Sequence, residues 1–260
     1  MKLPLLLVFS VLIGTGSGQP ASPAPAGPET KAEPAKEEKK PAPVDLGALL
    51  RFHYENRVRA FRDQNQVFRN VVLLGDSITE GFEVPRYFPG RRVLNRGIGG
   101  DVIGNQLAPD DPRGVLKRLD ESIFDCAPSH VFLMIGINDL NGGHTVDGME
   151  TGYRELLRRV KEHSPQLRVY VQSVLPTRGD FAARNEPVRE FNRRLERLAR
   201  EAGYPYLDLH RLFVDDGGEL KAEYTPDGLH LNDAGYRVWL REVERVLGWD
   251  RPQPAGAGGA

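Results

Sequence analysis

Apolar residues occur along this chain in short runs that are separated by segments with helical periodicity. The short runs predict strands buried on both faces, at residues 71–74, 92–95, 130–135, 169–171 and 206–209. The periodic segments predict helices over residues 45–66, 112–124, 146–163, 187–202 and 233–247. Because strand and helix alternate along the chain, the pattern predicts an α/β fold, a parallel sheet with helices on both faces.

Residues at the ends of the periodic segments support the helix assignments. Pro112 suits a first helical turn, Gly203 suits the residue after a helix, and Asn232 suits an N-cap. In the first helix, one face carries a stripe that is formed by Leu46, Leu49, Leu50 and His53.

The first 44 residues divide into two segments of different composition. Residues 1–18 combine Lys2, an apolar run and small residues, which is the pattern of a secretory signal peptide; the alternative is an apolar N-terminal helix of the fold. Residues 19–44 are rich in Pro, Ala, Lys and Glu and predict a disordered linker. We therefore expect an exported protein (periplasm, cell surface or secreted) with one globular domain at 45–250 and a disordered tail at 251–260. No stable membrane span is expected after signal cleavage, and whether the signal is cleaved or retained as an anchor stays open.

Composition excludes several classes of function. The 260 residues carry a net charge of −1 and are 40% hydrophobic, which is typical of a globular protein that does not bind nucleic acid. The single cysteine, Cys126, excludes an internal disulfide and a cysteine-based zinc cluster, and its place beside an apolar strand predicts burial. Asp139 and His144 lie close in sequence but lack a third ligand at a recognisable spacing, so we expect no metal.

Ligands bind beyond the carboxyl ends of parallel strands, so the loops that follow the strands are the place to look for chemistry. Ser77 follows the strand at 71–74, where a sharp turn can present its hydroxyl to a cleft; the alternative is a helix N-cap. Asn138 follows the strand at 130–135, where its amide can stabilise a developing oxyanion; the alternative is an Asx-turn.

Two further loops carry candidate chemistry. The glycine-rich segment 97–101 allows the backbone to approach a ligand closely, but its spacing does not match the dinucleotide-binding fingerprint, and no cofactor is expected. Asp227 and His230 are three residues apart, so the carboxylate can accept one imidazole N–H and leave the other ring nitrogen as a general base. Together with Ser77, they supply a nucleophile, a base and an orienting carboxylate.

At these positions the chain resembles the SGNH hydrolases, also called the GDSL-type esterase and lipase family. The resemblance covers about residues 70–247, and Ile78 stands where the common name of the family has Leu. The matching residues are Ser77 in the first block, Gly100 in the second, Asn138 in the third, and Asp227 and His230 in the fifth.

The resemblance implies a three-layer α/β/α doubly wound sandwich of about five parallel strands, a flavodoxin-like arrangement. It also implies a catalytic triad of Ser77, Asp227 and His230. The oxyanion hole would consist of the N–H groups of Ser77 and Gly100 and the amide of Asn138, with neither cofactor nor metal.

Segments 95–101 and 175–179 are similar to the branch that includes the platelet-activating-factor acetylhydrolase catalytic subunits and bacterial exported acetylesterases. By analogy, this predicts an exported serine esterase that hydrolyses short-acyl, acetyl esters of a small molecule or polysaccharide, with carbohydrate as the alcohol. A lysophospholipase or thioesterase with the same site is the alternative, although the short, mixed segment 81–90 predicts no apolar lid. A catalytically silent binding module is the third interpretation. The oligomeric state stays open.

Overall fold

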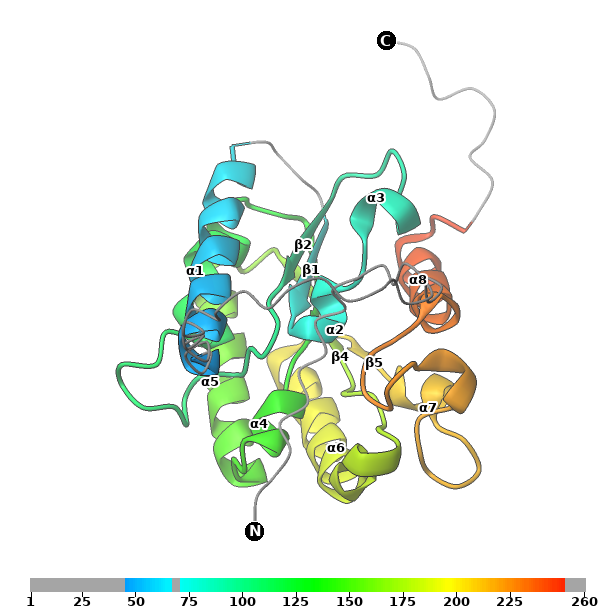
Figure 1. Ribbon diagram of the computed structural model, residues 1–260. Coiled ribbons are helices and arrows are strands. Elements are labelled where there is room, and N and C mark those ends of the chain that lie inside the picture. The colour runs from blue at the N-terminus through cyan, green and yellow to red at the C-terminus, as the bar shows by residue number, and fades with distance from the viewer. Residues whose placement is uncertain (1–44, 67–70, 251–260) are drawn as a thin grey trace, which may run out of the picture. The chain divides into compact units, whose positions relative to one another are not determined.

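A parallel sheet lies at the centre of the described chain, which comprises residues 45–66 and 71–250 of this computed structural model (Figure 1). The strand order is β2-β1-β3-β4-β5, and every neighbouring pair is parallel. The strands are β1 (Val71–Gly75), β2 (Val93–Gly97), β3 (His130–Met134), β4 (Arg168–Gln172) and β5 (Tyr206–Leu207). The predicted α/β fold is confirmed. The segments predicted as signal peptide, linker and tail lie outside the described residues, at 1–18, 19–44 and 251–260.

The order of the strands determines where a site can form. From β1 the chain moves to β2 on one side and then to β3 on the other, so the connections diverge at the carboxyl end of β1. Gly75, the last residue of β1, is in register with Gly97 of β2 and Met134 of β3. The ends of three strands are therefore aligned at the switch point where ligands bind in such sheets.

Helices cover both faces of this sheet. In the described chain the long helices are α1 (Leu46–Gln64), α5 (Val146–His163), α6 (Asn185–Ala202) and α8 (Asp233–Leu247). The short ones are α2 (Ser77–Glu80), α3 (Val84–Tyr87), α4 (Ile137–Asn141) and α7 (His210–Phe213). Short 3₁₀ segments are η1 (Val115–Lys117), η3 (Gly179–Arg184) and η4 (Ala222–Tyr224), and η2 (Asp120–Phe124) is a π-helical segment. α1 and α5 lie on one side of the sheet and α8 on the other (Figure 1). None of the helices in the described ranges is long and apolar enough to cross a membrane.

Several predicted helix boundaries are confirmed by local hydrogen bonding. α5 has the predicted bounds, and the Asn232 side chain accepts the Gly235 N–H at 3.1 Å as the predicted cap of α8. α6 ends at Gly203, which adopts the left-handed conformation with φ 75°. Cys126 is buried, as predicted.

The continuous helix predicted over 112–124 is wrong, because this segment forms only the separate turns η1 and η2. The reason is a polar side chain turned inward. Arg118 is 1% exposed and donates to the Asp101 carboxylate and to the carbonyls of Gly75 and Arg96. These bonds satisfy buried groups that a regular amphipathic helix would leave without partners.

The stripe predicted for α1 is only partly its packing face, with Leu50 and His53 half-buried beside the glycine-rich loop. Leu49 is 50% exposed, whereas Tyr54 and Phe61 are buried and pack with Ile98 of the glycine-rich loop. Aromatic side chains bury more area than leucines, so Tyr54 and Phe61 determine which face of α1 packs against the protein.

Candidate active site

Ser77 stands directly beyond β1, as the first residue of the short helix α2. Asp76 is the N-cap, and its carboxylate accepts the Ile78 N–H at 3.0 Å, so the N-cap interpretation of Ser77 is wrong. The turn is tight, because a Cβ on Gly75 would lie 2.2 Å from the Met134 carbonyl. The N–H of Ser77 is in the first helical turn, where no intrahelical acceptor exists.

The predicted partners of Ser77 converge on its hydroxyl from a loop far along the sequence. His230 Nε2 lies 3.0 Å from Ser77 Oγ, and His230 Nδ1 lies 2.7 Å from Asp227 Oδ2. The other Asp227 oxygen accepts the backbone N–H groups of Leu229 and His230 at 2.9 and 2.8 Å. The carboxylate therefore fixes both the imidazole and the loop that carries it.

The environment keeps the Asp227 carboxylate ionised. Partial burial opposes ionisation, but the hydrogen bonds from the His230 ring and from two backbone N–H groups outweigh it and lower the pKa of Asp227. The loop itself is fixed by a hydrogen bond from the Arg178 N–H to the Gly228 carbonyl at 2.8 Å. A side chain at Gly228 would collide with the Arg178 carbonyl, since its Cβ would lie 2.4 Å away.

Of the three residues predicted as oxyanion donors, Gly100 and Asn138 lie beyond strands on either side of β1. Asn138 is the second residue of α4. Its Nδ2 donates one of the two amide hydrogens to the Asp101 carbonyl at 2.9 Å. Gly100 adopts φ 75°, and within the described ranges its N–H has no hydrogen-bond acceptor. The structure thus leaves an unused N–H on each residue. Ser77, Gly100 and Asn138 are all partly exposed to solvent.

Three buried carboxyl groups, which sequence reasoning did not assign to catalysis, lie behind these loops: Asp76, Asp101 and Asp139. Burial raises the pKa of Asp76 to about 7, and the charges of the other two carboxylates add to the effect of burial. Burial also raises the pKa of Asp101 and of Asp139, although Arg118 opposes the shift at Asp101.

Each of these carboxyls organises the backbone of the site. Asp101 pairs with Arg118 at 2.7 Å and accepts the Gly114 N–H at 2.7 Å. Asp139 accepts the Ile103 N–H at 3.1 Å and contacts His144 Nδ1 at 3.1 Å. Arg118 was missed by sequence reasoning, because its segment also carries Arg113, Lys117, Asp120 and Glu121 and no local signal distinguishes Arg118 from them.

Residues 45–66 and 71–250 contain no cluster of three or more His, Cys, Asp or Glu side chains that could hold a metal ion. The Asp139–His144 contact is a pair only.

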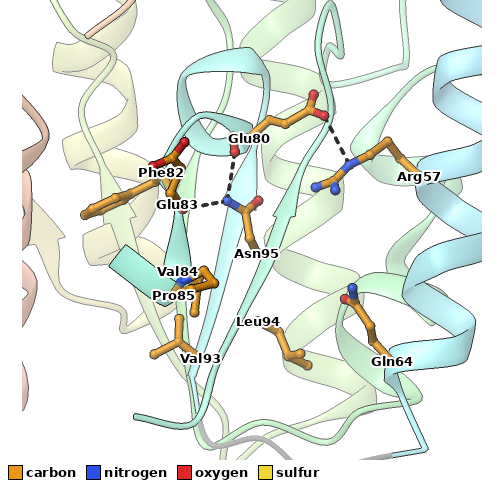
Figure 2. A pocket seen from close by; sticks show the side chains of 10 residues that line it. All are labelled: Arg57, Gln64, Glu80, Phe82, Glu83, Val84, Pro85, Val93, Leu94 and Asn95. Carbon is orange, nitrogen blue, oxygen red and sulfur yellow. Dashed lines mark hydrogen bonds and ion pairs between the residues drawn. The ribbon is translucent and has the colours of Figure 1, made fainter. Parts of the chain in front are cut away.

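A pocket of about 420 Å³, which Ser77 does not line, lies beside the edge strand β2 (Figure 2). Arg57 of α1 and Glu80 of α2 face each other at one end of it, with 3.3 Å between Nε and Oε1. Its remaining lining residues are Gln64, Phe82, Glu83, Val84, Pro85, Val93, Leu94 and Asn95.

Comparison with known proteins places this chain among ester hydrolases. Residues 73–238 match the sequence profile of the GDSL-like Lipase/Acylhydrolase family. The platelet-activating factor acetylhydrolase IB subunit alpha1 of Bos taurus is 33% identical over 235 residues, which cover 85% of this chain and 93% of the relative.

Solved structures agree on the fold. A GDSL-like lipase from Bacteroides thetaiotaomicron superposes with a TM-score of 0.62 and 21% identity, covering 79% of this chain and 100% of that one. An acetylxylan esterase from Geobacillus stearothermophilus superposes with a TM-score of 0.55 and 21% identity, covering 71% and 97%. At these identities the likeness concerns the fold alone.

Proposed function

Because this chain belongs to the GDSL-like lipase/acylhydrolase family and is a carboxylic ester hydrolase, we propose that it is a serine esterase with Ser77 as nucleophile, His230 as base and Asp227 as orienting carboxylate. One observation carries this assignment: the Asp227–His230–Ser77 contacts of 2.7 and 3.0 Å form a continuous chain. Such a chain is the geometry that nucleophilic acyl transfer requires.

The reaction follows from this chain of contacts. His230 Nε2 takes the proton of the Ser77 hydroxyl as Oγ attacks the ester carbonyl, while Asp227 stabilises the imidazolium that forms. The N–H groups of Ser77 and Gly100 and the free amide hydrogen of Asn138 bind the tetrahedral oxyanion. The intermediate collapses as the bond to the alcohol oxygen breaks, His230 protonates the leaving alcohol, and the acyl group stays on Ser77 Oγ as an acyl-enzyme ester. Water, deprotonated by His230, then attacks the acyl carbonyl, and His230 returns the proton to Ser77 Oγ as the acid leaves.

The substrate we propose is an acetyl ester of a carbohydrate, met outside the cytoplasm. Relatives named acetylhydrolase support the acetyl group, and the N-terminal sequence pattern supports export. The surface supports a polar alcohol: in the described ranges, the large apolar side chains that are strongly exposed are Leu49 and Phe52 of α1. A lipase-like apolar entrance needs a larger patch.

A second candidate keeps the acetyl group and changes the alcohol. The relatives that are 33% identical along most of their length are named for platelet-activating factor, which favours an acetylated lipid of that kind.

Hydrolysis of p-nitrophenyl acetate, butyrate and octanoate by the full chain, with Ser77→Ala as blank, tests the mechanism and the acyl length. We expect acetate to be hydrolysed fastest and the activity to disappear in the blank. Activity that survives in Ser77→Ala would overturn the nucleophile, and a preference for octanoate would overturn the short acyl group.

Acetylated xylan and platelet-activating factor, compared at equal ester concentration, then separate the two alcohols. A fluorophosphonate probe tests the third interpretation, a catalytically silent binding module, because the probe labels only an activated serine. Absence of labelling in folded protein would overturn Ser77 as an activated nucleophile.

A further inference from the structure

The loop that carries Gly100 is held by hydrogen bonds on both sides of that residue. The Ile98 N–H donates to the Gly75 carbonyl at 3.2 Å, and the Asp101 N–H donates to the Ile98 carbonyl at 3.1 Å. The Gly99 N–H donates to Glu80 Oε2 at 2.6 Å. Three of four consecutive N–H groups are therefore committed to the protein, and that of Gly100 is left for a ligand.

Of these three bonds, the one to Glu80 is made by a side chain. Gly99 and Gly100 lack side chains, so side-chain packing does not restrain their torsions. The bond from the Gly99 N–H to Glu80 fixes the Ile98–Gly99 peptide, from which the next peptide, with the Gly100 N–H, extends. A bond to a carboxylate is stronger than one to a neutral acceptor. Glu80 thus supplies restraint where the two glycines supply none.

Glu80 is itself held by α1. Its Oε2 lies 3.1 Å from His53 Nε2, and its Oε1 lies 3.3 Å from Arg57 Nε. Figure 2 shows the contact between Arg57 and Glu80. Arg57 also donates twice to the Gly97 carbonyl, at 3.1 and 2.8 Å, so it ties Glu80 to the start of the same loop. The Glu80 and Arg57 side chains are each 25% exposed, so water competes only partly for these bonds.

Glu80 and Ser77 are also on the same short helix, α2, one turn apart. A single rigid element therefore carries the nucleophile and the group that holds the Gly99 peptide. This arrangement fixes the position of the Gly100 N–H relative to Ser77 Oγ. Transition-state stabilisation depends on such positioning to within a fraction of an ångström.

We propose that Glu80, braced by His53 and Arg57, is a positioning residue that aims the Gly100 N–H at the oxyanion. The inference rests on the proposed function, since it presupposes that Gly100 donates to the tetrahedral intermediate. It extends the working site to α1, which lies before the residues matched by the family profile.

The test compares Glu80→Ala, Glu80→Gln and the control Glu83→Ala in the full chain, with p-nitrophenyl acetate as substrate. Glu83 is a matched control because it is three residues away and strongly exposed, with 62% of its side chain accessible. For Glu80→Ala we expect kcat to fall by about 10- to 100-fold, somewhat less than the loss of a whole donor, with KM within about threefold. Glu80→Gln retains an acceptor oxygen for Gly99, so its kcat should stay within about fivefold of wild type.

Thermal unfolding of each variant separates an effect on positioning from an effect on stability. If Gln restores kcat while the unfolding midpoint stays unchanged, Glu80 acts by positioning, because a purely structural role would not give that result. An unchanged kcat in Glu80→Ala, a change in KM alone, or equal losses in the Ala and Gln variants would overturn the proposal. Ser77→Ala in the same assay keeps the two levels apart. If it abolishes activity while Glu80→Ala is harmless, only the role of Glu80 fails; if it leaves activity intact, the proposed triad fails.

Discussion

The Asn138 amide donates one hydrogen to the Asp101 carbonyl and has a second one to offer. We expect Asn138→Ala to lower kcat on the order of 10²- to 10³-fold, because an oxyanion donor acts mainly in the transition state, while KM changes little. Steady-state kinetics on p-nitrophenyl acetate measure this. Asn141→Ala is the control on the same helix α4, and equal rates for the two variants would contradict the assignment.

Asp76 makes a second prediction at the scale of one residue. Its carboxyl has a pKa raised from 3.8 to about 7 by burial, so the unfolded chain releases this proton at lower pH than the folded one. The wild type therefore loses stability as pH rises from 4 to 7, and the loss is complete above pH 7. Asn at position 76 can still accept the Ile78 N–H but cannot ionise. We expect the stability of Asp76→Asn relative to the wild type to increase from pH 5 to pH 8, by at most on the order of 4 kcal/mol.

Chemical denaturation at the two pH values measures that gain. Asp45→Asn serves as control, because Asp45 caps α1 with a bond of 3.1 Å to the Ala48 N–H from an exposed position. A difference between Asp76→Asn and wild type that is independent of pH would show that the buried carboxyl does not titrate in this range.

Individual candidate site residues could be named from the sequence because of their place after a predicted strand or their spacing. Ser77 and Asn138 come directly after apolar runs, and Asp227 and His230 have a spacing that lets them meet. Glu80 and Arg118 could not be named, because their roles depend on loops that are distant in sequence. The Gly99 N–H that Glu80 accepts is 19 residues away, and the Gly75 carbonyl that Arg118 contacts is 43 residues away.

At the scale of the element, periodicity predicted the long helices and the strands but not the short turns. α2, α3, α4 and α7 are four or five residues long, too short to show a hydrophobic period. The turns η1 and η2 replaced a predicted helix because Arg118 is turned into the protein. Local patterns cannot reveal a buried charge whose partner, here Asp101, lies in another loop.

The contact between α5 and α6 gives a prediction at this scale. Glu150 of α5 lies 3.0 Å from both Arg194 and Arg197 of α6 and 3.4 Å from Arg154 of its own helix. We expect Glu150→Gln to lower the free energy of unfolding by about 1 kcal/mol, the upper end for exposed pairs, since one carboxylate serves three guanidinium groups. The loss should shrink at high salt, because the arginines are partly exposed.

Urea unfolding at low and high salt measures this effect. Glu155→Gln is the control, because the Glu155 carboxylate pairs with Arg158 on its own helix. Equal losses for the two variants would show that bridging between helices adds nothing. Bonds of this kind also give the many arginines of α5 and α6 a structural role.

At the scale of the whole molecule, the parallel sheet brings together site residues that are far apart in sequence. Ser77 and His230 are 153 residues apart, yet their side chains meet beyond the carboxyl end of β1. The alternation of strands and helices was enough to predict this edge as the place of the site. It could not predict that α1 closes one side of the glycine-rich loop, because its aromatic contacts with Ile98 are long-range.

The domain limits proposed from the sequence make the last prediction. We expect a fragment of residues 45–250 to keep kcat and KM within about twofold of the full chain, because the sheet, the Ser77–His230 contact and the α1 brace all lie inside it. A fragment of residues 71–250 retains the residues matched by the family profile but lacks α1. Removing Tyr54 and Phe61 exposes Ile98 and should cost several kcal/mol of stability, at about 1.5–3 kcal/mol for each large apolar side chain.

The shorter fragment also loses His53 and Arg57, so its kcat should fall even where it remains folded. Kinetics at a temperature well below each unfolding midpoint, measured by circular dichroism, separate the two effects. A 71–250 fragment with full stability and full kcat would show that α1 is dispensable and that the family core alone forms the enzyme. A 45–250 fragment that fails to fold would show that the domain extends beyond the limits proposed from the sequence.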